Sequence, residues 1–299
     1  MKTTWPTIVT QVCNLPYRRF TTCAALAIFV AIALPQTANA HGELEIQIAA
    51  ATKKIHAATN NAAQLYLDRA KLHREHKDWD AAKSDYDRAL QLDPKLPNVD
   101  FYRAKMLDDS GELKSARKLF DKILKRSPND GEAFIGRARV LVKLGDRPSA
   151  IGDFRSGLAL LPSPPSEYFL ELAQIFAAVG KTNDALRALD EGIKRGGATI
   201  SLQSCALELE LGRKNHDAAL TRIDTLISLS PRKENLLAQR GEILLATGRT
   251  SEAQESFNAA LSAIERLPAV LQKAAPMQKL KARLHAALGK IAAPQNAKK

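Results

Sequence analysis

The chain has 299 residues, of which 44 are basic and 32 acidic, and its formal net charge is +12. The excess lies at the two ends. Residues 1–40 hold three basic residues and residues 266–299 hold eight, with no acid in either stretch, whereas residues 41–265 are nearly neutral with 33 basic and 32 acidic residues. This distribution argues against a nucleic-acid partner, because nucleic-acid-binding proteins concentrate basic residues on one face. A length of 299 residues with only 5% aromatic residues suits a helical repeat array better than one compact core.

The N-terminal residues 1–40 are predicted to form a secretory signal peptide. Arg18 and Arg19 precede an apolar run at 23–34, and the Ala-Asn-Ala tripeptide ending at Ala40 has the small side chains that signal peptidase requires. We therefore expect export across the inner membrane, cleavage after Ala40, and a periplasmic or secreted protein. The run is shorter than the roughly 20 apolar residues of a membrane span. An uncleaved anchor is the alternative, and the arginine pair leaves Sec and twin-arginine export both open.

A period of 34 or 35 residues dominates residues 62–265. Six alanines mark it, each followed four positions later by a large apolar residue: Ala82–Tyr86, Ala116–Phe120, Ala150–Phe154, Ala185–Leu189, Ala219–Ile223 and Ala253–Phe257. Twelve positions earlier, five of the six repeats carry another small residue: Ala70, Ala104, Ala138, Ala173 and Gly241, with Leu207 in the fifth. Small residues at this spacing let two antiparallel helices approach closely, while the larger residue fills the space beside the contact.

The ends of the two helices in each repeat are also marked. Proline follows the second helix in four repeats, where it prevents the helix from continuing. Gly111, Gly145, Gly180 and Gly248 lie between the two helices of their repeats, where a left-handed residue can end the first helix. This combined pattern resembles the tetratricopeptide repeat family over residues 62–265, in six consecutive repeats. The resemblance implies an all-α fold, a right-handed α-solenoid of antiparallel helix pairs with a concave groove that binds a protein or an extended peptide.

Both ends of the repeat array are expected to carry a capping helix. Residues 41–61 form an N-terminal half-repeat, in which Leu44, Ile48, Ala51 and Ile55 give one apolar stripe. Residues 266–292 form a basic C-terminal cap whose helix starts at Pro276 and has the apolar stripe Met277, Leu280, Leu284 and Leu288. Residues 293–299 are expected to be a disordered tail.

The sequence contains no pattern typical of a catalytic or cofactor site, such as G-x-S-x-G, H-E-x-x-H or a phosphate-binding glycine loop. No catalytic residue, cofactor or metal is therefore predicted. We interpret His73 and His76 as packing or solvated side chains rather than metal ligands, and Cys205 as a packed apolar residue. Arginine directly precedes the first small residue in several repeats, and aspartate follows it sixteen positions later. This spacing predicts structural ion pairs between Arg69 and Asp85 and between Arg137 and Asp153.

The resemblance places the candidate binding residues on the first helix of each repeat. Three positions before the small residue, the first four repeats carry an apolar row, and directly after it the first three carry a basic row: Leu67, Phe101, Ile135 and Leu170, and Lys71, Lys105 and Arg139. Both rows are expected to point away from the helix-pair core and to hold a segment with acidic and apolar side chains. The alternative interpretation is that Lys71–Glu75 and Lys105–Asp109 are i, i+4 pairs that serve only solubility.

These observations favour a non-enzymatic, exported scaffold that binds a protein or extended peptide in its groove. The main alternative is an obligate structural or assembly subunit of a cell-envelope complex, and a metal-binding or enzymatic protein is a distant third. The C-terminal helix caps the array, and Lys279, Lys281 and Arg283 offer a weak contact for an anionic membrane or an acidic partner.

Overall fold

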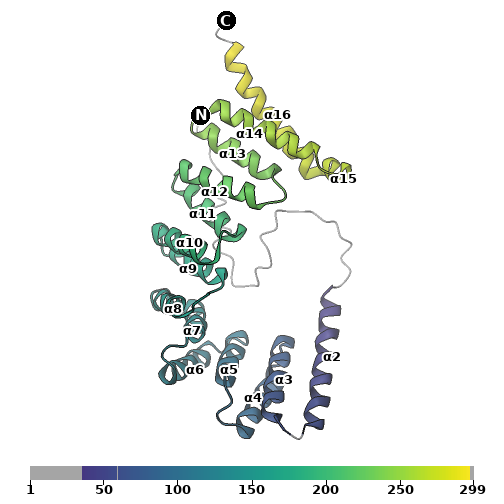
Figure 1. The fold of residues 1–299 in the computed structure, drawn as a ribbon, viewed down its shortest axis with the longest axis vertical. Coiled ribbons are helices and arrows are strands. Elements are labelled where there is room, and N and C mark those ends of the chain that lie inside the picture. Colours follow the sequence, from purple (N-terminus) through teal and green to yellow (C-terminus); the bar gives the residue numbers. More distant parts are fainter. Residues whose placement is uncertain (1–35, 59, 297–299) are drawn as a thin grey trace. The chain divides into compact units, whose positions relative to one another are not determined.

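The computed structural model describes residues 36–58 and 60–296, and within these ranges the chain is helical with no strand. The described residues fall into two compact units that divide between Pro164 and Pro165. The fold of the described residues is therefore all-α, as predicted, and Figure 1 shows that within each unit the helices succeed one another in chain order.

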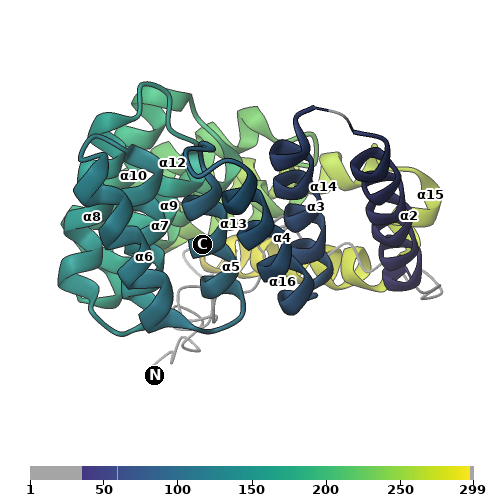
Figure 2. The ribbon, with the colours of Figure 1, turned by 90° about the horizontal axis from the view of Figure 1, so that it is seen from below.

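The first unit contains the N-terminal cap and three helix pairs. Its helices are α2 (Gln36–Ala57), α3 (Ala62–His76), α4 (Trp79–Leu92), α5 (Val99–Asp109), α6 (Leu113–Arg126), α7 (Gly131–Lys143) and α8 (Arg147–Leu160). The pairs are α3 with α4, α5 with α6 and α7 with α8, and each pair also contacts the next. Helix α2 packs against α3 on the side away from α5 (Figure 2), so it covers the open end of this unit.

The second unit contains three further helix pairs and the C-terminal segment. Its helices are α9 (Ser166–Ala178), α10 (Thr182–Gly196), α11 (Ile200–Gly212), α12 (His216–Leu229), α13 (Glu234–Ala246), α14 (Thr250–Glu265), α15 (Ala269–Lys273) and α16 (Ala275–Asn296). Here α9 pairs with α10, α11 with α12 and α13 with α14, while α16 packs on α14.

The recurring small residues lie where the paired helices touch, which confirms the predicted helix-pair contact. Ten alanines of the repeat pattern have no exposed surface: Ala70, Ala82, Ala104, Ala116, Ala138, Ala150, Ala173, Ala185, Ala219 and Ala253. Beside them the large residues, such as Tyr86 and Phe120, are equally buried. At Gly241 an added Cβ would lie 2.4 Å from the ring of Phe257, so even alanine would be crowded at this position.

The turns between paired helices have the predicted left-handed backbone. Gly111, Gly145, Gly180 and Gly248 have φ between 75° and 88°. In the first and fifth repeats the equivalent residues are Lys77 and Lys214, with φ of 67° and 59°. A non-glycine residue in this region is strained, so the backbone of these two turns follows the repeat geometry despite its local cost.

The two predicted arginine–aspartate pairs are confirmed. In the first repeat both Nε and Nη2 of Arg69 donate to Asp85 at 2.7 Å, and this hydrogen bonding raises the pKa of Arg69. Arg137 makes the same bidentate contact with Asp153 and also donates to Asp121 of the preceding repeat at 2.8 Å. Arg137 therefore joins the helices of its own repeat and links that repeat to α6.

Two helix boundaries differ from the expected ones. Helix α2 begins at Gln36, so residues 36–40 of the predicted signal peptide are helical, while residues 1–35 lie outside the described residues. Helix α16 extends from Ala275 to Asn296, so its last residues, 293–296, fall within the stretch expected to form the tail. None of the helices described combines the length and apolarity needed to cross a bilayer.

The tight contact at Ala150 makes a direct prediction about stability. Ala150→Leu adds bulk where α8 meets its partner helix, so the free energy of unfolding should fall by about 1–3 kcal/mol. Ala159→Leu, at an exposed position of the same helix, is the matched control and should leave stability nearly unchanged. Urea unfolding of the two variants measures both values, and equal stability of Ala150→Leu and the parent would contradict the assigned contact.

Candidate functional site

The predicted apolar row is not an open surface, and the expectation is wrong for two of its members. Leu67 and Ile135 are 2% and 0% exposed and belong to the helix-pair core. The physical reason is helix geometry: a residue three positions before a buried alanine lies almost on the same face of the helix. Leu170, in the second unit, is half-buried.

Phe101 is also half-buried and lies at the edge of the core. Its ring packs edge-on against that of the buried Phe120, with centroids 6.0 Å apart, and against Tyr102 at 5.6 Å. Phe101 thus supports the packing of α5 on α6 and offers only part of its ring to a ligand. Replacing it would disturb folding as well as binding, contrary to the sequence-based expectation.

The basic row, in contrast, remains at the surface of the first helices. Lys71 donates to Asp68 at 2.9 Å, rather than to Glu75 four positions later. Its ammonium also lies 4.5 Å from the ring centroid of Tyr102 on α5. Lys71 is therefore engaged in a local ion pair and a cation–π contact that connects the first helices of two repeats.

Lys105 is a half-buried cation with no carboxylate within ion-pair distance in the described part of the chain. Its ammonium lies 5.7 Å from the ring centroid of Phe101. Asp109, the expected partner, lies beside Arg74 instead, with Nη1 and Oδ2 3.7 Å apart. Burial lowers the pKa of Lys105, and the positive charges of Arg74 and Arg139 lower it further, while the carboxylates of Asp109 and Glu132 oppose part of this shift. An anion at this position would relieve both effects.

Arg74 was missed by sequence reasoning and completes this group. Its side chain is 14% exposed, and its Nε and Nη1 atoms are buried without a hydrogen-bond acceptor. The hydroxyl of Tyr86 is likewise buried without a partner, and burial raises the pKa of Tyr86. Arg74 lies one helical turn after Ala70, the only signal in the sequence that it faces the helix-pair contact. We call Arg74, Lys105 and Arg139 the cationic surface.

The acids near the cationic surface are already engaged. Asp108 accepts a hydrogen bond from Lys143 at 2.6 Å, which joins α5 to α7, while burial raises the pKa of Asp108. Asp109 lies beside Arg74. The cationic surface can therefore donate hydrogen bonds and supply positive charge to an incoming carboxylate.

The histidines of α3 form no metal site in the structure. Nδ1 of His73 lies 3.4 Å from Asp78 and its Nε2 lies 3.9 Å from Asp85. Across residues 36–58 and 60–296, no group of three or more histidine, cysteine, aspartate or glutamate side chains is arranged to hold a metal ion.

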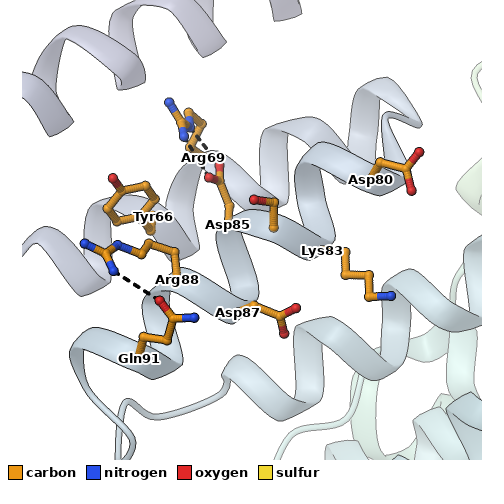
Figure 3. Close-up of a pocket in the computed structure, with 9 residues that line it drawn as sticks. Tyr66, Arg69, Asp80, Lys83, Asp85, Asp87, Arg88 and Gln91 are labelled. Atoms are coloured by element: carbon orange, nitrogen blue, oxygen red, sulfur yellow. Dashed lines mark hydrogen bonds and ion pairs between the residues drawn. The ribbon is translucent and has the colours of Figure 1, made fainter.

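A depression of about 610 Å³ is lined by residues of α3 and α4, the first helix pair (Figure 3). Its charges largely compensate one another: Arg69 binds Asp85, Arg88 donates to Gln91 at 3.1 Å, and Asp87 pairs with Arg103 at 3.1 Å. Figure 3 shows the Arg69–Asp85 and Arg88–Gln91 contacts along its wall. The depression is lined by acids and bases together, including Asp80 and Lys83, so it favours a ligand of neither sign, and the cationic surface is the stronger candidate site.

Comparison with known families agrees with this architecture. Models described as tetratricopeptide repeats match residues 73–140 and 235–266. The chain is a tetratricopeptide repeat protein. The C-terminal part of a TPR repeat-containing protein from Cytophaga hutchinsonii has a similar structure, with a TM-score of 0.58 and 14% identity over 77% of this chain and 93% of that chain.

Two further solved structures have weaker similarity to this tetratricopeptide repeat protein. One is a tetratricopeptide repeat protein from Parabacteroides merdae, with a TM-score of 0.47 and 19% identity over 83% of this chain and 99% of that one. The other is YrrB, described as a TPR protein with an unusual peptide-binding site, with a TM-score of 0.47 and 16% identity over 62% and 94% of the two chains. No curated protein sequence matches the chain.

The partly buried charge of Lys105 makes a prediction about stability. Lys105→Met keeps the packing stem but removes a cation without an anion, so the free energy of unfolding should rise by about 0.5–1 kcal/mol at neutral pH. Lys118→Met, at an exposed position of α6, is the control and should change little. Urea unfolding measures the free energy of unfolding of both variants. A Lys105→Met variant that is less stable than the parent would show that burying the Lys105 charge does not destabilise the fold.

The stability difference between Lys105→Met and the parent should depend on pH, because the pKa of Lys105 is lowered in the folded protein. The unfolded chain binds the proton of Lys105 more tightly than the folded chain does, so parent stability rises as pH passes from the folded to the unfolded pKa. The advantage of Lys105→Met should therefore shrink at alkaline pH. An advantage that is independent of pH would show that charge is not its cause.

Proposed function

We propose that this tetratricopeptide repeat protein is an exported scaffold that binds an acidic, extended segment of a protein partner on the first helices of repeats one to three. Tetratricopeptide repeats are protein-interaction scaffolds, which supports the general part of the proposal. The observation that carries the specific part is Lys105, a half-buried ammonium with no carboxylate of the described residues within ion-pair distance.

The chemistry of the cationic surface indicates the kind of partner. Arg74 has two buried N–H groups without acceptors, and a hydrogen bond to a charged group stabilises a complex more than one between neutral groups. The exposed part of Phe101 lies next to Lys105 and that of Tyr102 next to Lys71, and both suit apolar side chains that flank an acid. Because Leu67 and Ile135 are buried, affinity comes mainly from charge and hydrogen bonding rather than from an apolar row.

Charge reversal at Lys105 tests the proposed binding site. Partners captured from an envelope extract, and a synthetic peptide of alternating glutamate and leucine, are titrated against Lys105→Glu. Affinity should fall by about tenfold or more, since loss of a hydrogen bond to a charged group costs roughly 1.5–3 kcal/mol. The loss should be larger at low salt, because salt screens exposed charges.

Lys118→Glu, on α6, makes the same charge change at an exposed position and is the matched control. Circular dichroism confirms that both variants fold. If both variants bind as the parent does, the cationic surface is not the binding site. Equal losses in both would show that net charge alone governs binding.

An obligate subunit of a cell-envelope assembly is the second candidate, and it would use the same surfaces for a permanent interface. Purification behaviour distinguishes the two. A soluble monomer that binds its partner reversibly favours the scaffold, whereas a protein that is insoluble without its partner favours the obligate subunit.

The export part of the proposal rests on the leader alone. The mature chain should begin at His41, because the Ala-Asn-Ala tripeptide ends at Ala40 after a short apolar run. N-terminal sequencing of protein recovered from outside the cytoplasm measures the start. An intact leader in that fraction would replace the soluble scaffold with a membrane-anchored one.

A further inference from the structure

Helix α15 carries the most exposed large apolar side chain reported for the described residues. Val270 is 81% exposed and the neighbouring Leu271 is 37% exposed, and no residue of α15 is buried. This helix of five residues lies between α14 and α16 and contributes no buried residue to the core. Its apolar side chains therefore have no structural role that explains their exposure.

The turn that presents these side chains is held in place by side-chain hydrogen bonds. Nε2 of Gln272 donates to the carbonyl oxygens of Glu265 and Leu267, at 2.8 and 2.7 Å. Nε2 of Gln278 donates to the carbonyl oxygen of Gln272 at 2.7 Å. The side chains of Gln272 and Gln278 thus connect the end of α14, α15 and the start of α16, and the apolar tip is presented by an ordered turn.

The tip is flanked mainly by cations, and Glu265 is the acid next to it in the chain. Arg266 and Lys273 lie at its two sides in the chain, Lys279 lies in the first turns of α16, and the whole stretch 266–299 contains no aspartate or glutamate. All three of these side chains belong to exposed residues. Arg283, by contrast, lies 3.3 Å from Glu242 of α13, so it is engaged within the protein. Arg266, Lys273 and Lys279 are therefore exposed cations that lie close to α15 in the chain.

We propose that α15 is a membrane-contacting tip that binds the surface of an anionic phospholipid bilayer. Val270 and Leu271 enter the boundary between headgroups and acyl chains, while Arg266, Lys273 and Lys279 bind the phosphate groups. The surface fits a bilayer better than a protein pocket, because a specific protein interface covers about 800 Å² on each partner. Val270, the partly covered Leu271 and the cations near them in the chain form a surface too small for that, but one that suits lipid. This inference does not depend on the proposed peptide site.

Cosedimentation of the full chain with vesicles tests the proposal. Vesicles of phosphatidylcholine with and without about one third phosphatidylglycerol are compared, and the binding that requires phosphatidylglycerol is the quantity measured. This difference removes any contribution of the leader that does not depend on lipid charge. The unmodified chain should show phosphatidylglycerol-dependent binding that weakens as salt rises.

Two variants separate the apolar from the charged contribution. Val270→Ser with Leu271→Ser should reduce the phosphatidylglycerol-dependent binding about tenfold, as should Lys273→Glu with Lys279→Glu. Ile200→Ser, which alters another exposed apolar residue (43% exposed), is the matched control and should bind as the parent does. Circular dichroism shows that all variants are folded.

Three results would overturn the inference. They are an absence of phosphatidylglycerol-dependent binding by the parent, unchanged binding in both double variants, or an equal loss in Ile200→Ser. If the parent binds no vesicles but the serine variant loses an acidic protein captured from an extract, the tip is a protein contact instead.

Discussion

Close contact between two helices at small side chains is the constraint on which the rest of this protein depends. In each repeat the backbones approach at residues such as Ala138 and Ala150, which have no exposed surface, and a large residue such as Phe154 fills the adjoining space. Because the same contact recurs with nearly constant spacing, α3, α5 and α7 present equivalent residues to the same side of the first unit. The cationic surface exists because residues from different repeats are brought together in this way.

Arginine–aspartate pairs add a second, directional link between repeats. Arg103 pairs with Asp87, Arg137 with Asp121 and Arg240 with Asp224, each time joining a first helix to the second helix of the preceding repeat. Guanidinium groups suit this position because their planar donors can serve two carboxylates at once. Between the third and fourth repeats the corresponding residues are Arg155 and Leu172, so this pair is not encoded in the stretch where the two units divide.

The cations of the candidate site are paired less closely than the arginines that join the helices. Arg69 and Arg137 satisfy their donors with bidentate carboxylate contacts, whereas Arg74 lies 3.7 Å from Asp109 with two buried donors that make no hydrogen bond, and Lys105 has no carboxylate within ion-pair distance among the described residues. The same fold thus contains arginines that are hydrogen-bonded to carboxylates and stabilise it, and cations that lack such hydrogen bonds and lower its stability. Such a local cost is what a binding surface shows before its ligand arrives, since the ligand supplies the missing acceptors.

Periodicity in the sequence determined the helix pairs, the left-handed turns and the Arg69–Asp85 and Arg137–Asp153 pairs, because these depend on spacing within one repeat. Only the tertiary structure decided which neighbouring face of a first helix is open, and it placed Leu67 in the core. It also placed Asp109 beside Arg74 rather than Lys105, and Val270 on an exposed turn. These outcomes depend on which side chains of neighbouring helices come into contact. Such contacts between repeats do not recur at a fixed spacing, so the sequence does not reveal them.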